Sequence, residues 1–221
     1  MSAHLTGRAP QEHTTAALPE TGAPAGRPWV REPCPVDRDM IAELAPAALA
    51  AAGGERDASQ FADAACANNG HIPVPHGTGR VLIGGLPETP EPAGLLYLLL
   101  PLRLITAHSG HGPPVQARLA TELRGIELLA TAPHAQRAGV GSALLHAAHA
   151  LAADDGVRVL LAKIAARDFP VLRWWRHRGY TLAQPGQNVR LHLEHPITCH
   201  DGHNGYRLAG WAPGRSARRP A

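Results

Sequence analysis

Cysteine, lysine and large aromatic side chains are all scarce in this sequence of 221 residues. It contains 4 Trp, 3 Tyr and 2 Phe residues, and Lys163 is its single lysine. The 3 cysteines are odd in number, lie far apart and form no C-x-x-C pair, which argues against a disulfide framework and against a cysteine-based zinc site. Unpaired cysteines are typical of a reducing compartment, so we expect a cytoplasmic protein.

A hydrophobic run long enough to cross a membrane is also missing. The most apolar stretch, residues 94–105, has about half the length that a membrane helix needs, and it contains Pro101 and Arg103. The sequence does not open with the basic and then apolar segments of a signal peptide. We therefore expect a soluble protein with no membrane partner.

Apolar material for one folded core is present, because 44% of the residues are hydrophobic and 18% are charged. Much of the excess of Gly and Pro lies near the ends. We expect a disordered tail at 1–27, a folded domain at 28–196 and a flexible tail rich in Arg, Gly and His at 197–221. The net charge of +3 is mild and partly carried by that last tail, which argues against nucleic acid as a partner. The tail contains Arg207, Arg215, Arg218 and Arg219.

Hydrophobic periodicity and turn residues predict alternating strands and helices between the tails. Strands are expected at 29–32, 80–83, 94–105, 118–132, 157–164, 180–183 and 188–194. Helices are expected at 38–52, 57–68, 139–154 and 168–178, with Pro46 kinking the first of them. The alternation indicates an α/β domain.

The segment between the strand at 118–132 and the helix at 139–154 carries a glycine-bearing turn. Gly139 and Gly141 stand at the start of the helix, where free backbone N–H groups and the helix dipole favour an anion, and Arg137 adds positive charge. The turn is not a Walker A loop, because no Gly-Lys-Ser/Thr follows it. It is not a three-glycine dinucleotide motif either, because residue 144 is Leu.

This turn, Gln136-Arg137-Ala138-Gly139-Val140-Gly141, resembles the acetyl-CoA motif Gln/Arg-x-x-Gly-x-Gly/Ala of the GCN5-related N-acetyltransferases, the GNAT superfamily. The segment 168–180, DFPVLRWWRHRGY, is similar to a later helix of that family, and the resemblance covers about residues 28–195. It implies a single-domain α/β fold. In this fold a mixed, mostly antiparallel sheet is flanked by helices and has a V-shaped splay between its central strands.

The resemblance also implies an acyltransferase that uses acetyl-CoA as its co-substrate and acetylates a primary amine of a small molecule or peptide. It implies no metal and leaves a homodimer open. The residues that it assigns to acetyl-CoA binding are Leu129, Ala130, Thr131, Gln136, Arg137, Ala138, Gly139, Val140, Gly141 and Ser142.

Glu127 is the candidate general base. Two-residue alternation along the strand places it on the same side as Leu129 and Thr131, although a purely structural carboxylate would fit the sequence as well. Related enzymes often carry a glutamate two positions earlier, where this chain has Gly125. His134, on the loop, is a weaker candidate.

The residue that would protonate the leaving thiolate differs from the family pattern. The family's tyrosine falls at Trp175, and an indole cannot usefully deliver that proton. Tyr180 is expected to pack in the core, and His146 and His149 are expected on the solvent side of their helix. The missing tyrosine favours an alternative, a non-catalytic acyl-CoA-binding or regulatory module.

The acceptor pocket is expected between the first two helices, their Gly53-Gly54 linker and the turn around Pro185. Carboxylates near that linker could attract a cationic amine, although solvation explains them equally: Glu55, Asp57 and Asp63. A cluster of metal-ligand types near the C-terminus is interpreted as solvated: His192, His195, Cys199, His200 and His203. A nucleic-acid protein that uses the Arg-rich tail is the weakest alternative.

Overall fold

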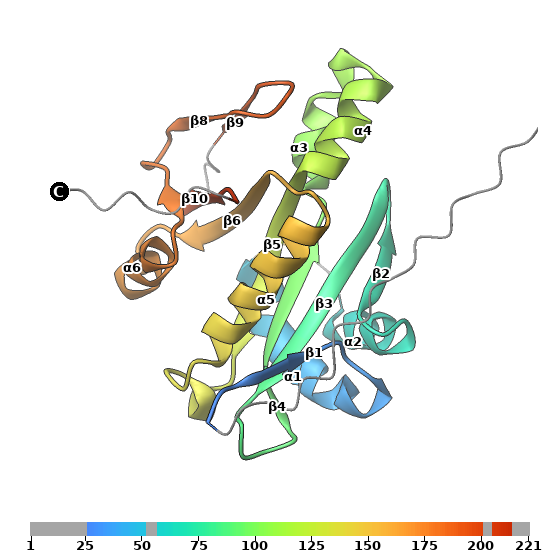
Figure 1. Cartoon of the computed structure of the whole chain (residues 1–221), viewed down its shortest axis with the longest axis vertical. Coiled ribbons are helices and arrows are strands. Elements are labelled where there is room, and N and C mark those ends of the chain that lie inside the picture. The colour runs from blue at the N-terminus through green and yellow to red at the C-terminus, as the bar shows by residue number, and fades with distance from the viewer. Residues whose placement is uncertain (1–25, 52–56, 201–204, 214–221) are drawn as a thin grey trace, which may run out of the picture.

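The computed structural model describes residues 26–51, 57–200 and 205–213 (Figure 1). Nearly all of the tail expected at 1–27 lies outside these ranges. The elements are, in order, β1 (Trp29–Arg31), α1 (Arg38–Ala51), α2 (Ala58–Ala67), β2 (His71–Val74), β3 (Gly77–Gly85), β4 (Pro92–Leu99), α3 (Leu102–Ala107), α4 (Pro113–Glu122), β5 (Leu123–Thr131), α5 (Val140–Asp154), β6 (Val159–Ala165), α6 (Phe169–His177), β7 (Thr181–Leu182), β8 (Asn188–Leu191), β9 (Ile197–His200) and β10 (Tyr206–Trp211). Short 3-10 turns lie at Pro35–Asp37, Ser109–His111 and Pro133–Ala135.

The main sheet has eight strands in the order β1-β3-β4-β5-β6-β10-β7, with β2 paired to β3. Its neighbouring strands are antiparallel except for β5 and β6, which are parallel. The parallel pairing runs only from Leu123 opposite Val159 to Ile126 opposite Ala162, and the strands then diverge (Figure 1). The expected fold class, a mixed and mostly antiparallel sheet with a central splay, is confirmed.

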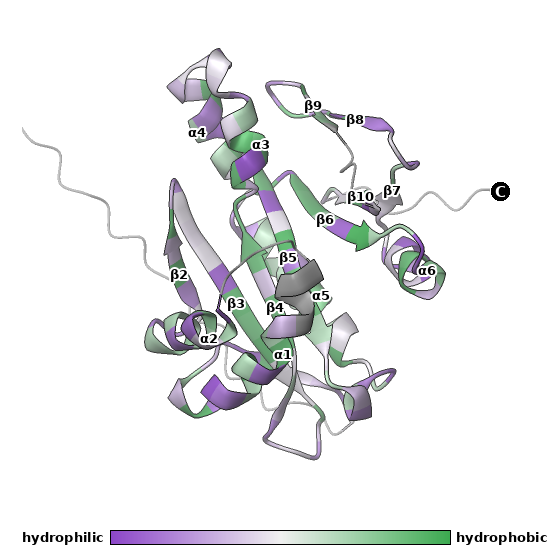
Figure 2. Cartoon of the chain, turned by 180° about the vertical axis from the view of Figure 1, so that it is seen from behind, coloured by the Kyte–Doolittle hydropathy of each residue, from purple (hydrophilic) through white to green (hydrophobic). Residues whose placement is uncertain are grey.

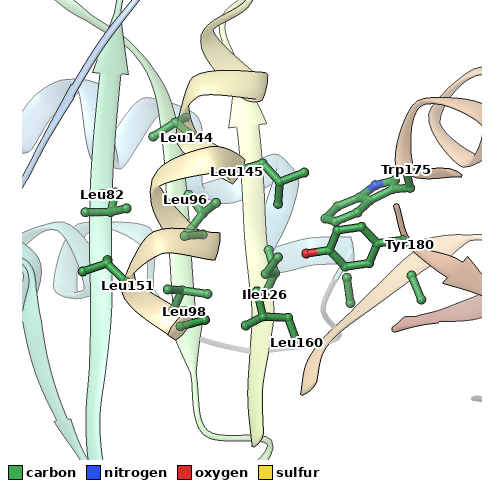
Figure 3. Packing of buried hydrophobic residues seen from close by; sticks show 14 of the residues in the cluster. Leu82, Leu96, Leu98, Ile126, Leu144, Leu145, Leu151, Leu160, Trp175 and Tyr180 are labelled. Atoms are coloured by element: carbon green, nitrogen blue, oxygen red, sulfur yellow. The ribbon is translucent and has the colours of Figure 1, made fainter. Parts of the chain in front are cut away.

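Helices cover both faces of this sheet, so successive strand residues are buried on opposite sides. On one face α5 packs Leu144 over Leu82 and Leu96 of β3 and β4 (Figure 3). On the other face Ile41 of α1 and Phe61 of α2 belong to a second buried cluster. Hydrophobic residues accordingly follow the central strands (Figure 2).

A third buried cluster contains residues of β5, β6 and β10 and joins two further regions that are far apart in the sequence. It includes Leu119 of α4, Leu191 of β8 and Ile197 of β9. An ion pair between Arg118 and Glu194 connects the same two regions. The strand expected at 188–194 is therefore β8, which pairs with β9 in a separate two-stranded sheet.

Two expected strands are partly helical, because prolines begin helices there. The strand expected at 94–105 ends at Leu99, and Pro101 precedes α3. The strand expected at 118–132 starts only at Leu123, because Pro113 and Pro114 open α4, where a missing backbone N–H costs nothing. Among the described residues, no helix has the length and apolar character needed to cross a membrane.

The boundary drawn at residue 196 excludes a strand that belongs to the main sheet. β10 lies between β6 and β7, with Tyr206 opposite Ala165 and Trp211 opposite Leu160. Its Leu208 and Ala209 are buried. The assignment of 197–221 to a flexible tail is thus wrong for β10, and Arg207 is a sheet residue.

Candidate active site

The predicted anion site lies at the beginning of α5. Gly139 precedes the helix with a left-handed φ of +92°, and no side chain caps the helix there. Arg137 is also left-handed, with a φ of +65°. The Ala143 N–H donates the first helical hydrogen bond, to the Gly139 carbonyl at 2.9 Å. The N–H groups of residues 140–142 lie ahead of this bond at the positive end of the helix dipole, where an anion can accept them.

Not every predicted loop amide is available to a ligand. The Gln136 N–H donates to the Pro133 carbonyl, and the Ala138 N–H donates to the Ala135 carbonyl, both at 3.3 Å. These two bonds hold the loop in its turn. Of the predicted set, Arg137 and residues 139–142 are left as the available donors.

Gly141 allows the helix to begin close to its neighbours. A Cβ atom there would lie 3.3 Å from the Thr131 Oγ1 and 3.9 Å from Cζ2 of Trp174. The start of α5, the end of β5 and the side of α6 therefore meet at this glycine. A larger residue would crowd the position where the backbone has to approach a ligand.

The end of β5 lies beside the splay and presents backbone groups to it. The Ala132 N–H donates to the Ala93 carbonyl of the β4 side at 2.8 Å. Because backbone groups alternate along an antiparallel strand, the N–H of Ala130 points toward β4 as well. The N–H groups of Leu129 and Thr131 point away from β4, toward the β6 side. The pairing of β5 with β6 has already ended there, at Ile126. These two N–H groups are the available donors at the splay.

Glu127 occupies a β-bulge, which the sequence did not reveal. In the β4–β5 ladder Tyr97 is opposite Leu128 and Leu98 is opposite Ile126, so Glu127 is the extra residue. Ile126 packs in the cluster under α5, whereas Leu128 packs in the cluster under α1 and α2. Strict two-residue alternation therefore fails at this point.

The bulge changes the predicted direction of the Glu127 side chain. Its Oε1 lies 3.0 Å from the position of a Cβ on Gly125, the residue whose open side faces away from α5. Leu129 packs against the α5 cluster on the opposite face. The expectation that Glu127 and Leu129 share a side is wrong. The exposed Glu127 carboxylate instead lies over Gly125, the position where related enzymes often carry their glutamate.

The aromatic residues of α6 divide between core and site. Trp175 is 5% exposed and Tyr180 3% exposed, and their rings pack edge to face at 4.5 Å. The expected core packing of Tyr180 is confirmed, and Trp175 packs in the same core cluster. Trp174 is only partly buried, and the Arg178 guanidinium lies 3.9 Å from its ring centroid. An Arg178 Nη2 hydrogen bond to the Ser142 Oγ joins α6 to the start of α5, a contact that sequence spacing cannot show.

Helical periodicity predicted His149 on the solvent side of α5. The residue is instead half-buried. Its Nε2 lies 3.1 Å from the Tyr180 Oη, and its ring stacks on Trp211 with centroids 4.0 Å apart. Burial lowers the pKa of His149 to about 4. His146 is exposed as expected. The stacking partner Trp211 comes from β10, which explains the difference.

The parts of the predicted acceptor pocket do not come together. Helices α1 and α2 pack against the β3–β5 face, whereas the turn at 184–187 follows β7 at the far end of the sheet (Figure 1). Asp57 caps α2 by accepting from the Ser59 N–H, and Asp63 pairs with Arg38. Glu55 and the Gly53-Gly54 linker lie outside the described residues.

The histidine cluster near the C-terminus is split between two contacts. The His195 ring meets the ring of His111 at 5.1 Å, and Cys199 is buried in the third cluster. In the ranges that the structure describes, no three His, Cys, Asp or Glu side chains are grouped to hold a metal ion. His203 lies outside those ranges.

Comparisons with known proteins point to one family. The model of the acetyltransferase (GNAT) family matches residues 75–180. A GCN5-related N-acetyltransferase from Kribbella flavida is 16% identical, covers 84% of this chain and 97% of its own, and has a TM-score of 0.55. The structure of yncA from Salmonella typhimurium with its cofactor acetyl-CoA is 14% identical, covers 88% of this chain and 98% of its own, and has a TM-score of 0.55. NAA60 from Arabidopsis thaliana in complex with acetyl-CoA is 14% identical, covers 85% of this chain and 99% of its own, and has a TM-score of 0.53. No curated protein matches the chain.

Proposed function

Because the chain belongs to the acetyltransferase (GNAT) family, we propose that it transfers an acetyl group from acetyl-CoA to a primary amine of a small molecule or peptide. One observation carries the proposal. The uncapped start of α5 lies next to the edge of β5 that has separated from β6. An anion-binding helix end and an open strand edge therefore adjoin, as a phosphate-bearing thioester requires.

The residues present fit acetyl-CoA. The diphosphate would accept hydrogen bonds from the N–H groups of Arg137 and residues 139–142, where two left-handed residues expose the backbone. Gln136 and Ala138 would shape the loop, since their N–H groups already have carbonyl partners. When bound, acetyl-CoA supplies a thioester whose carbonyl carbon accepts the amine.

Backbone groups of β5 would stabilise the charge that develops during transfer. The N–H groups of Leu129 and Thr131 point into the splay and would donate to the carbonyl oxygen as it becomes negative. Ala130, whose N–H points toward β4, would only space these two donors. Fixed backbone donors need no reorganisation during the reaction, which makes them effective.

Glu127 would act as the general base. An alkylammonium with a pKa of about 10.4 must lose a proton before its nitrogen can form the new bond to carbon. The exposed Glu127 carboxylate, directed away from α5 by the bulge, would accept that proton directly or through one water molecule. The departing thiolate would take its proton from solvent, because Trp175 is buried and has no acidic group.

The extent of the domain and its compartment are also part of the proposal. The acetyltransferase domain would extend from about residue 28 to 213, because β10 completes the sheet. We place the protein in the cytoplasm. Cys34, Cys66 and Cys199 are all free thiols, as a reducing compartment allows.

Substitution of Glu127 by Gln tests the proposed chemistry. Glu127→Gln should lower kcat on the order of 100-fold or more, because an amide cannot accept the proton, while acetyl-CoA binds as before. The measurement is calorimetry with acetyl-CoA followed by release of free thiol over a panel of amines. Glu88→Gln, a change of an exposed carboxylate in the turn after β3, serves as the matched control.

The same measurements separate the alternatives. Unchanged turnover and pH profile in Glu127→Gln would rule out this base. Binding of acetyl-CoA without turnover on any amine would favour the non-catalytic module instead. No binding of acetyl-CoA at all would contradict both functions.

A further inference from the structure

A cation is held against the start of α5 without a carboxylate partner. Arg178, the residue that ends α6, donates from Nη2 to the Ser142 Oγ and from Nη1 to the Trp174 carbonyl at 3.4 Å. Its guanidinium also lies 3.9 Å from the Trp174 ring centroid. The side chain is thus fixed on three sides.

The charge of this guanidinium is not matched by a carboxylate within the part of the chain that the structure describes. Among the described residues, no ion pair includes Arg178. Burial lowers the pKa of Arg178, and no acidic group opposes that effect. The beginning of α5, toward which the guanidinium points, carries the positive end of a helix dipole. Two positive groups therefore adjoin around Ser142, and no carboxylate of the described residues pairs with the guanidinium.

The end of α6 explains only part of the arrangement. An arginine near a helix C-terminus commonly donates to the last carbonyls, and the bond to the Trp174 carbonyl is of this kind. The second bond, to Ser142, reaches another helix 36 positions earlier in the sequence. Arg173 and Arg176 of the same helix are exposed and have no such anchor. Helix capping therefore does not account for the position of the guanidinium.

From this geometry we infer that Arg178 is a donor-site residue that binds the diphosphate of acetyl-CoA from the α6 side, opposite the loop. This inference rests on the proposed function and extends it to a residue outside the glycine motif. A guanidinium presents a planar fork of N–H donors that matches two phosphate oxygens. Ser142 and Trp174 are positioning residues, because they hold that fork in one orientation before the ligand arrives.

Three ligands distinguish this role in calorimetry: CoA, dephospho-CoA, which keeps the diphosphate but lacks the 3′-phosphate, and pantetheine, which has no diphosphate. Arg178→Gln should weaken CoA and dephospho-CoA equally, by about 10- to 100-fold, because a charge-assisted hydrogen bond to each is lost. Pantetheine should bind as it does to the original chain. Arg178→Lys should fall between, since it keeps the charge and loses the fork.

Matched controls separate binding from folding. Arg173→Gln removes an exposed charge from the same helix and should leave all three affinities unchanged. Ser142→Ala keeps the backbone N–H and the Arg178 charge but removes the anchor, and should cost only a few-fold in CoA affinity. If Arg178→Gln does not fold, as circular dichroism would show, Arg178→Lys and Ser142→Ala carry the test.

Two results would overturn the inference. Loss of affinity for CoA alone, with dephospho-CoA unaffected, would assign Arg178 to the 3′-phosphate. Equal affinities in Arg178→Gln and the original chain would exclude any contact. If the original chain binds pantetheine and CoA equally weakly, the proposed function itself fails, which is a different outcome from a failure of Arg178.

Discussion

The beginnings of α5 and α6, two helices joined by the Arg178–Ser142 hydrogen bond, are built in opposite ways. Asp168 caps α6, and its carboxylate accepts the Val171 N–H at 3.1 Å. Asp57 caps α2 in the same manner. α5 begins at Gly139, with no capping side chain. In α2 and α6 an aspartate side chain thus accepts a hydrogen bond from a first-turn amide. In α5 no side chain does so.

The difference implies that stability is given up at α5. A capping side chain contributes about 1 kcal/mol to the free energy of unfolding, and a glycine that precedes a helix contributes less. A carboxylate at the start of α5 would supply this stabilisation, but it would also occupy the anion site. The missing side-chain cap, which α3 and α4 share, leaves the start of α5 open to an anion.

Ser142→Asp would place a carboxylate at the start of α5, as Asp168 does at the start of α6, and should have the largest effect on acetyl-CoA affinity. The new carboxylate would accept from the first amides of α5 and pair with Arg178, as a bound phosphate would. We expect acetyl-CoA affinity to fall about 100-fold, while the free energy of unfolding rises by about 1 kcal/mol. Calorimetry and urea unfolding measure the two effects.

Ser142→Asn is the matched control, because it has the same shape and no charge. It should lose far less affinity than Ser142→Asp. A Ser142→Asp variant that binds acetyl-CoA as well as the original chain would show that the start of α5 is not the phosphate site.

In the middle of α5, unlike at its start, a polar group has partners within the chain, because His149 contacts Tyr180 and Trp211. Burial lowers the pKa of His149 to about 4, below the 6.5 of an unfolded histidine. The unfolded chain therefore binds a proton that the folded chain does not, and stability is lost as the pH falls from 6.5 toward 4. Allowing for solvent around the half-buried ring, we expect a loss of about 1–2 kcal/mol.

Urea unfolding at pH 4.5 and pH 7.5 tests this expectation. His149→Gln, which offers the Tyr180 hydroxyl a polar partner and does not titrate, should reduce the difference between the two pH values. His146→Gln removes the smaller, electrostatic contribution to the lowered pKa of His149 at an exposed position, and should change the difference much less than His149→Gln does. Equal pH dependence in His149→Gln would mean that other groups cause the acid sensitivity.

Asp168→Ala removes the side-chain cap of α6 and should have the smallest effect. Loss of the cap should lower the free energy of unfolding by about 1 kcal/mol and leave acetyl-CoA affinity unchanged. Asp168→Ser retains a capping oxygen and should restore most of the stability. A loss of acetyl-CoA affinity comparable to that of Ser142→Asp would remove the distinction between the two helix starts.

Local signals predicted most of the helices and strands. The helices expected at 57–68 and 168–178 agree with α2 and α6, which Asp57 and Asp168 cap, and Gly179, with its φ of +86°, follows the end of α6. Signals of this kind act within one turn of chain, so the sequence contains them completely. They failed in the region between β4 and β5, where leucine-rich segments suit a strand and a helix equally, and prolines began α3 and α4.

Contacts between distant segments could not be predicted. Glu127 reversed its side because the pairing of β5 with β4 contains an extra residue, and register is a property of two strands. β10 was missed because its short, glycine-containing segment becomes a strand only between β6 and β7. The same limit applies to Arg178, which meets Ser142 only when α6 packs beside α5.

The scarce lysine, cysteine and aromatic residues said little about activity, whereas the order of six residues, from Gln136 to Gly141, indicated the family and predicted the place of a candidate anion site. A helix start needs only neighbouring residues to form, so the sequence alone specifies it. Tertiary structure decided the directions of the other candidate groups. The Glu127 carboxylate, the Leu129 and Thr131 amides and the Arg178 guanidinium take their directions from strand register and helix packing, which join residues far apart in the chain.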